Sequence, residues 1–138
     1  MGKVTVQITI RNWDDIVTLA LGKRKRAPRS LTAEALVDTG ATKFYLKPSV
    51  ISALGLRQIG EGTSHTMSNR FEKRRVFSPV ELEIQGRTGR FDVIELPENL
   101  PNIVGQIPLE DLDWVVDPKA RKLIPNPAHP DGVRFDDY

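Results

Sequence analysis

One short stretch constrains this chain more than any other: the seven residues Ala-Leu-Val-Asp-Thr-Gly-Ala at positions 35–41. Its apolar start predicts a β-strand that delivers Asp38 to the strand end. Gly40 then lets the backbone turn sharply, because without a Cβ it can adopt positive φ or approach another segment closely. Thr39 adds a hydroxyl that can donate and accept a hydrogen bond. We therefore expect a carboxylate held on a stiff corner between strand and loop, a better platform for chemistry than a flexible loop.

The length and composition predict a single globular domain. A chain of 138 residues is long enough to bury a hydrophobic core of its own. The apolar share of 39% is typical of a soluble protein, and no apolar run is long enough to span a membrane. The N-terminus lacks the apolar segment of a secretory signal, so we expect a cytoplasmic protein. With no cysteine, disulfides and thiolate metal sites are excluded.

Most of the chain alternates apolar and polar residues with a period of two, which predicts a β-rich domain. The predicted strands are 3–10, 16–21, 31–37, 44–46, 63–67, 71–77, 79–85, 91–96, 114–116 and 122–124. One short helix begins at Pro48 and stops at Gly55, and a second covers residues 108–112. We expect one domain over residues 1–125 and a proline-rich tail over residues 126–138.

Positive charge is concentrated in one predicted loop. Residues 23–29 carry five of the 20 basic residues, while 18 acidic residues outnumber the basic ones left in the rest of the chain. Such a run is usually a solvated turn, and a contact with nucleic acid or an acidic substrate is the alternative. His65 and His129 lie far apart without ligand spacing, so we expect no metal site.

In its ordered motifs the chain resembles the retropepsin-like aspartic proteases, the single-domain family of retroviral proteases and many bacterial homologues. The features occur in the family's order: Asp-Thr-Gly-Ala at 38–41, a helix ending in Leu54-Gly55-Leu56, a hairpin in the flap position, Ile103-Val104-Gly105 before a second helix, and Val115–Pro118. Together they cover roughly residues 3–125. The resemblance implies a mainly β fold, a closed acid-protease barrel with one or two short helices and one lobe per chain.

The resemblance also implies roles for individual residues. Asp38 is the catalytic acid of an aspartic-type endopeptidase. The residues that support its loop are Thr39, Gly40, Ala41, Ile103, Val104 and Gly105. A flap that closes over a bound peptide has its tip at Met67, Ser68, Asn69 and Arg70. The family's chemistry uses no metal and no organic cofactor.

The number of Asp-Thr-Gly motifs implies a partner. Acid proteolysis of this type uses two carboxylates that face one water, and the chain contains one Asp-Thr-Gly and no Asp-Ser-Gly. At 138 residues it is too short for two lobes. The resemblance therefore implies a homodimer in which a twofold axis brings two copies of Asp38 together. We expect an extended peptide or protein substrate, and neither a membrane nor a nucleic-acid partner.

Two other functions stay open on the sequence alone. A chain with this fold that lost turnover would serve as a peptide-binding or assembly module, and the other alternative for Asp38 is a structural turn. A small basic β-domain would instead contact nucleic acid through residues 23–29. Cleavage that is lost in the Asp38→Asn variant would support an enzyme over the binding module. Salt-sensitive binding to nucleic acid would support the basic β-domain.

Overall fold

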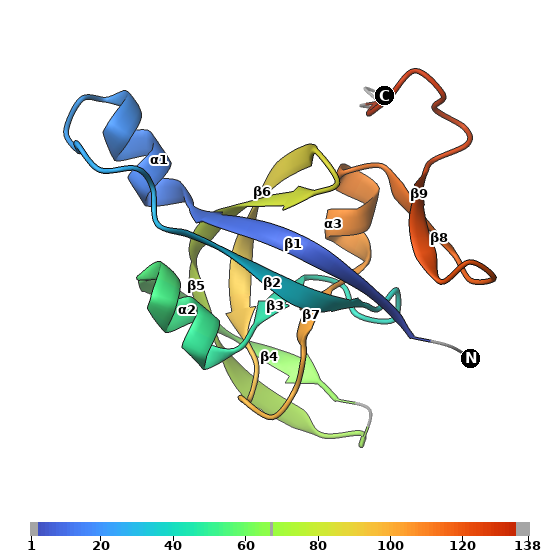
Figure 1. Cartoon of the computed structure of the whole chain (residues 1–138). Helices are drawn as coiled ribbons and strands as arrows, with labels where there is room; N and C mark the ends of the chain where they lie inside the picture. The colour runs from blue at the N-terminus through green and yellow to red at the C-terminus, as the bar shows by residue number, and fades with distance from the viewer. Residues whose placement is uncertain (1–2, 67, 135–138) are drawn as a thin grey trace.

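The computed structural model describes residues 3–66 and 68–134, and it is mainly β. The strands are β1 (Val4–Asn12), β2 (Ser30–Val37), β3 (Phe44–Leu46), β4 (Gln58–His65), β5 (Phe71–Ile84), β6 (Arg87–Glu95), β7 (Asn102–Val104), β8 (Trp114–Asp117) and β9 (Lys122–Pro125). The helices are α1 (Trp13–Ala20), α2 (Pro48–Leu54) and α3 (Gln106–Asp111). Strands in the order β1-β2-β7-β3-β6-β5 close a barrel, because β5 pairs back onto β1 (Figure 1). The predicted closed β-barrel is confirmed.

Alternation along the strands separates the barrel interior from its surface. In β1, Ile8 and Ile10 are fully buried, whereas Gln7 is exposed. The largest fully buried side chains on the barrel strands are Phe44, Ile8, Ile10, Leu46, Leu82 and Ile84. Burying each of them removes enough apolar surface from water to contribute roughly 1.5–3 kcal/mol. This shared interior is what favours closure of the barrel.

The C-terminal end of β2 is hydrogen-bonded to a neighbouring strand on each side. β2 is antiparallel to β1 and parallel to β7, where Leu36 lies opposite Ile103. A buried amide ties these strands to the end of β3: Asn102 donates from Nδ2 to the Glu34 carbonyl oxygen and accepts at Oδ1 from the Lys47 N–H. The strand end that leads into Asp38 is therefore held rigidly.

The strand predicted over residues 16–21 is wrong, because these residues belong to α1 and the turn after it. Asn12 caps α1 by accepting a hydrogen bond of 3.0 Å from the Asp15 N–H. Asp14 and Asp15 also lie in the first turn, where the helix dipole favours negative charge. The periodicity of an apolar run as short as residues 16–21 does not distinguish a helix from a strand. The described residues form three short helices, not one or two.

β5 is longer than predicted. The strands expected over 71–77 and 79–85 form one strand that runs through Pro79. Its register against β6 shifts between Phe77 and Val80, and proline is tolerated at such a bulge because it has no N–H to pair. The second half of β5 closes the barrel, and its first half forms a projecting hairpin with β4 (Figure 1).

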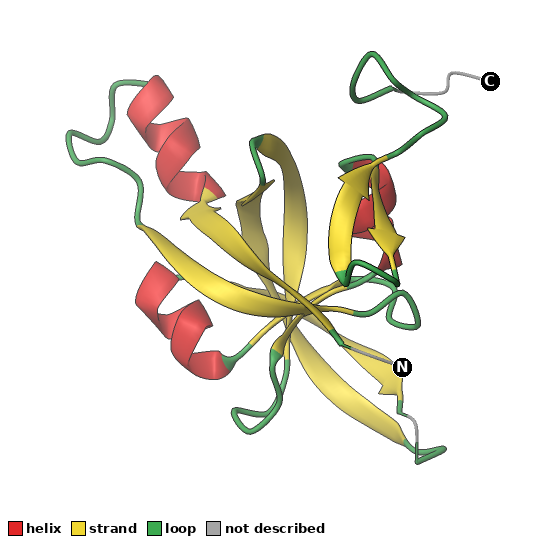
Figure 2. Cartoon of the chain, turned by 45° about the vertical axis from the view of Figure 1, so that its right-hand side comes forward, coloured by secondary structure: helices red, strands yellow, loops and turns green. Residues whose placement is uncertain are grey.

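The helices and the C-terminal strands lie outside the barrel. α1 and α2 lie on one side of it, and α3 lies beside the β8–β9 hairpin on the other (Figure 2). The predicted hairpin of residues 114–116 and 122–124 is confirmed. Pro48 and Gly55 bound α2 as predicted, and Gly55 adopts a φ of 64°. Among the described residues, no helix combines the length and apolar character needed to cross a bilayer.

Candidate active site

Asp38 lies where β2 leaves the barrel. Its N–H donates to the Val104 carbonyl oxygen at 3.0 Å, which continues the pairing of β2 with β7 by one residue. The Ala41 N–H closes the turn by donating to the Asp38 carbonyl oxygen at 3.1 Å. The Asp38 side chain is half-buried, and its Oδ1 accepts a hydrogen bond of 2.9 Å from the Gly40 N–H. The carboxylate is thus oriented by its own loop and still reaches solvent.

The loop after Asp38 is bound along its length to the start of α3. Three of its carbonyl oxygens accept hydrogen bonds from successive N–H groups: Ala41 from Gln106 at 2.8 Å, Thr42 from Ile107 at 3.0 Å, and Lys43 from Gly105 at 2.8 Å. N–H groups at a helix start have no partner within the helix, and the loop supplies one for each. The position of the carboxylate therefore depends on backbone bonds more than on side chains.

The residues predicted to support this loop lie in it or beneath it. Val104 is fully buried in the core, and Gly105 packs against the loop backbone. Ile103, between Asn102 and Val104 in β7, is half-buried and faces away from the core. Thr39 is exposed and Ala41 half-buried. The structure thus brings both predicted segments, 38–41 and 103–105, into one bonded unit.

This bonded unit lies in a part of the chain that is similar to a known family. The family model described as aspartyl protease matches residues 29–107, more than half of the chain, from just before β2 to the first residues of α3. The chain belongs to the retropepsin-like aspartyl protease family. A comparison with curated proteins finds no match. The predicted resemblance is confirmed.

In this chain, a row of apolar side chains crosses the outer face of the barrel beside Asp38. Successive members lie opposite one another in the strand pairing: Leu36 on β2, Ile103 on β7, Tyr45 on β3, Ile94 on β6 and Val76 on β5. All five are half-buried, while the residues that alternate with them in β2, β3 and β7 are buried in the core. Sequence reasoning missed this row, because pairing between distant strands assembles it.

The β4–β5 hairpin projects from the barrel, as predicted (Figure 1). β4 begins at Gln58, earlier than the expected residue 63. At the tip Ser68, Asn69 and Arg70 are exposed, and Asn69 adopts a φ of 60°. Met67, the fourth predicted flap residue, lies outside the described residues. The hairpin therefore projects with a polar tip.

The two histidines of the chain make unrelated contacts. The His65 ring stacks on Phe71 at 4.6 Å between centroids, and its Nε2 lies 2.8 Å from Asn69 Oδ1. His129 Nδ1 lies 2.5 Å from Asp113 Oδ2. In the described part of the chain, no three His, Asp or Glu side chains gather as metal ligands.

Part of the basic loop, residues 23–29, is structural. Asp15 is 4% exposed and pairs with Arg29, Nε to Oδ2 at 2.8 Å, and with Arg24, Nη1 to Oδ1 at 3.3 Å. The hydrogen bonds from Arg29 hold the pKa of Asp15 below its usual value, against the opposing effect of burial. The loop precedes β2 whereas Asp38 follows it, so eight strand residues, about 26 Å, separate the two.

Proposed function

We propose that two copies of this chain form an aspartic endopeptidase, in which a pair of Asp38 carboxylates activates a water molecule that hydrolyses peptide bonds. The observation that carries the proposal is a half-exposed carboxylate, oriented by Gly40, on a loop bound to residues 105–107. Such a loop presents the acid to solvent in one orientation, which general acid–base chemistry requires. Because each chain carries one Asp-Thr-Gly corner, the second carboxylate comes from a second copy.

Two carboxylates that face one water cannot both ionise easily, so the pair holds one proton and titrates as a unit. The ionised Asp38 takes a proton from the water as its oxygen attacks the carbonyl carbon, and the protonated Asp38 gives its proton to the carbonyl oxygen. In the second step, the first carboxyl returns its proton to the leaving nitrogen and the C–N bond breaks. One hydroxyl of the diol protonates the other carboxylate, which restores the starting pair.

The apolar row supports an extended peptide as the substrate. It begins at Leu36, two residues before Asp38, and reaches Val76 in the hairpin strand β5. Apolar side chains of a peptide laid across it would lose contact with water, while peptide backbone groups pair with strand-like partners. Closure of the hairpin, with Ser68, Asn69 and Arg70 at its tip, would exclude water from the site.

Incubation of the purified protein with a denatured protein mixture across pH 3–7 tests the proposal, because this range brackets the carboxyl pKa values. The Asp38→Asn variant should lose cleavage by about 10³-fold or more, since an amide can neither accept nor supply the proton. Asp14→Asn is the matched control: the same chemical change at the start of α1, which should leave cleavage intact. Cleavage that survives Asp38→Asn would contradict the proposal.

A mixing experiment tests the need for two copies. Adding an excess of Asp38→Asn protein to a fixed amount of wild type would convert active pairs into mixed pairs with one carboxylate. Activity should then fall toward zero as the excess grows. Activity that does not change would mean that one copy works alone. A dimeric wild type that leaves substrate intact at every pH would favour the peptide-binding module instead.

A further inference from the structure

The outward side of α1 is apolar, which reverses the usual pattern of a surface helix. The side chain of Asp15 is buried, whereas Val17 is 37% exposed and Leu21, the residue just after the helix, is 64% exposed. Trp13, Val17 and Leu21 recur at intervals of four residues, so they lie along one side of the helix. A surface helix normally buries its apolar side and turns its charged side chains toward water. The described residues thus leave Val17 and Leu21 uncovered.

Trp13 begins this apolar side and is half-buried. The exposed Arg90 of β6 lies over its ring, with the guanidinium carbon 4.8 Å from the ring centroid. Tryptophan is enriched where proteins meet the boundary between water and lipid, because its indole is apolar over most of its area and polar at its N–H. Trp13 therefore extends the apolar side of α1 and has a cation beside it.

The loop after α1 presents unpaired cations next to these apolar side chains. Arg24 holds the loop in shape: its Nε donates to the Arg26 carbonyl oxygen at 3.1 Å, and its Nη1 pairs with Asp15 at 3.3 Å. The side chains of Lys23, Lys25 and Arg26 are exposed and form no hydrogen bond or ion pair with any described residue. Residues 13–29 carry five basic residues against two acidic ones, a net charge of +3.

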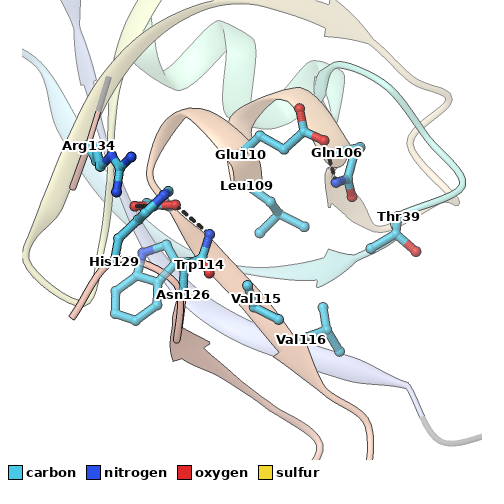
Figure 3. A pocket seen from close by; sticks show the side chains of 11 residues that line it. Thr39, Gln106, Leu109, Glu110, Trp114, Val115, Val116, Asn126, His129 and Arg134 are labelled. Atoms are coloured by element: carbon cyan, nitrogen blue, oxygen red, sulfur yellow. Dashed lines mark hydrogen bonds and ion pairs between the residues drawn. The ribbon is translucent and has the colours of Figure 1, made fainter. Parts of the chain in front are cut away.

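α1 and the loop after it project from one corner of the barrel (Figures 1 and 2). A hollow of about 600 Å³ lies elsewhere, beside Thr39, where Leu109 and Val115 face into it (Figure 3). Among the described residues that line this hollow, none belongs to α1 or to residues 21–26. A projecting apolar surface fits a soft partner into which its side chains can sink, and the surface of a bilayer is such a partner.

We propose that this corner of the molecule, the α1 tip, binds the surface of an anionic lipid bilayer. The tip consists of the apolar side chains Trp13, Val17 and Leu21 and the cations Lys23, Lys25 and Arg26. The apolar side chains enter the boundary between headgroups and acyl chains, and the cations pair with anionic headgroups. Nucleic acid is the other polyanion that such a loop could contact, but its phosphates would gain nothing from Val17 and Leu21.

Binding at a bilayer surface requires no membrane-spanning helix, so the proposal replaces the sequence-based expectation of no membrane partner. The tip lies before β2 and Asp38 follows it, with eight strand residues, about 26 Å, between them. A chain bound through the tip would therefore keep the Asp38 corner in water. The inference does not depend on proteolysis, because none of the tip residues belongs to the Asp38 loop or to the apolar row on the barrel.

The test is the partition of the full chain onto lipid vesicles, measured by flotation. The vesicles contain phosphatidylcholine alone or with about one-third phosphatidylserine. Wild type should bind the anionic vesicles about tenfold or more tightly than the neutral ones, and added salt should weaken this binding. Leu21→Glu should reduce binding to anionic vesicles by about tenfold or more, because a charge is costly in the apolar boundary. Ile59→Glu, the matched control, makes a similar change at a side chain 45% exposed on β4 and should not alter binding.

A second variant tests the cations. K23Q/K25Q/R26Q should weaken binding to the anionic vesicles by about 100-fold, since each basic side chain near such a surface contributes roughly fivefold. K119Q/R121Q/K122Q removes the same charge from the exposed end of the β8–β9 hairpin and is the matched control. It should bind like wild type. Circular dichroism checks that every variant is folded.

Equal binding to neutral and anionic vesicles, or binding to neither, overturns the inference. Binding that K23Q/K25Q/R26Q weakens and Leu21→Glu leaves unchanged also overturns it, because attraction to any polyanion would then suffice. Retention of the protein on single-stranded DNA in that case would identify nucleic acid as the partner. Leu21→Glu should cleave soluble peptides like wild type, so vesicle binding and cleavage can fail independently of each other.

Discussion

Gly105 lies against the backbone of Lys43 so closely that no side chain fits between them. A Cβ placed on Gly105 would lie 2.4 Å from the Lys43 carbonyl oxygen and 2.8 Å from that of Ala41. The φ of Gly105 is −87°, which any residue can adopt, so close approach and not backbone conformation requires the glycine. The position of the loop that carries Asp38 is coupled to the absence of a side chain at residue 105.

Gly105→Ala should therefore displace the Asp38 loop. We expect the free energy of unfolding to fall by about 1–3 kcal/mol from overpacking, and kcat/KM to fall tenfold or more because the carboxylate moves out of line. Urea denaturation and peptide cleavage measure the two effects. Gly62→Ala, whose Cβ would meet nothing within 4 Å, is the control for stability. Equal stability losses in both variants would contradict the predicted clash.

Ile103→Ala shortens a side chain in the apolar row. For peptides with large apolar residues beside the cleaved bond, kcat/KM should fall by about 10- to 100-fold, as expected for lost apolar contacts in a binding site. Peptides with alanine at those positions should be affected much less. Leu19→Ala, on the exposed side of α1, is the matched control. The same loss for both kinds of peptide would show that Ile103 supports the Asp38 loop and does not contact substrate.

Gly55→Ala tests a contact between α2 and the basic loop. Gly55 has a φ of 64°, and a Cβ there would lie 1.9 Å from Arg29 Nη1, whose side chain pairs with Asp15. Gly22 has a φ of 73° with open space around it. Gly22→Ala should therefore cost only the left-handed backbone penalty, about 1 kcal/mol. Gly55→Ala should cost more, because Arg29 must also move. Equal losses in urea denaturation would mean that Arg29 moves aside freely.

Stability should decline in acid through two buried carboxylates. Hydrogen bonds from Arg29 lower the pKa of Asp15; for Asp113, burial acts to raise the pKa, and hydrogen bonds from Asn126 and His129 outweigh it and lower the value. A lowered pKa means that the folded state binds protons less readily than the unfolded state. The stabilisation is therefore complete above the unfolded pKa of about 4 and is lost as the pH falls through the lower folded value.

The measurement is the free energy of unfolding in urea between pH 6 and pH 2. Wild type should lose stability below about pH 4, and Asp15→Asn should start lower and decline less steeply. Parallel curves for the two proteins would show that Asp15 does not contribute to acid sensitivity.

Local patterns predicted several elements correctly. The alternation in residues 3–10 and 31–37 identified β1 and β2, and the signals of Pro48 and Gly55 bounded α2. The same method failed at residues 16–21. There the deciding interaction is the cap from Asn12 to the Asp15 N–H, which overrides an ambiguous apolar run. The sequence pattern also predicted two strands on either side of Pro79 where the structure has the single strand β5. The bulge that tolerates this proline is visible only in the pairing of β5 with β6.

The sequence by itself determined the chemistry of the site: Asp38 at a strand end, a glycine two residues later, and one such corner per chain. Local residue types suffice for this, since charge, turn formation and strand periodicity act between near neighbours in the chain. Only the tertiary structure decided what surrounds that corner. The parallel pairing of β2 with β7, the row from Leu36 to Val76 and the attachment of segment 126–134 to Asp113 join residues far apart in sequence. Their register is set by how the whole barrel packs, and no local pattern encodes it.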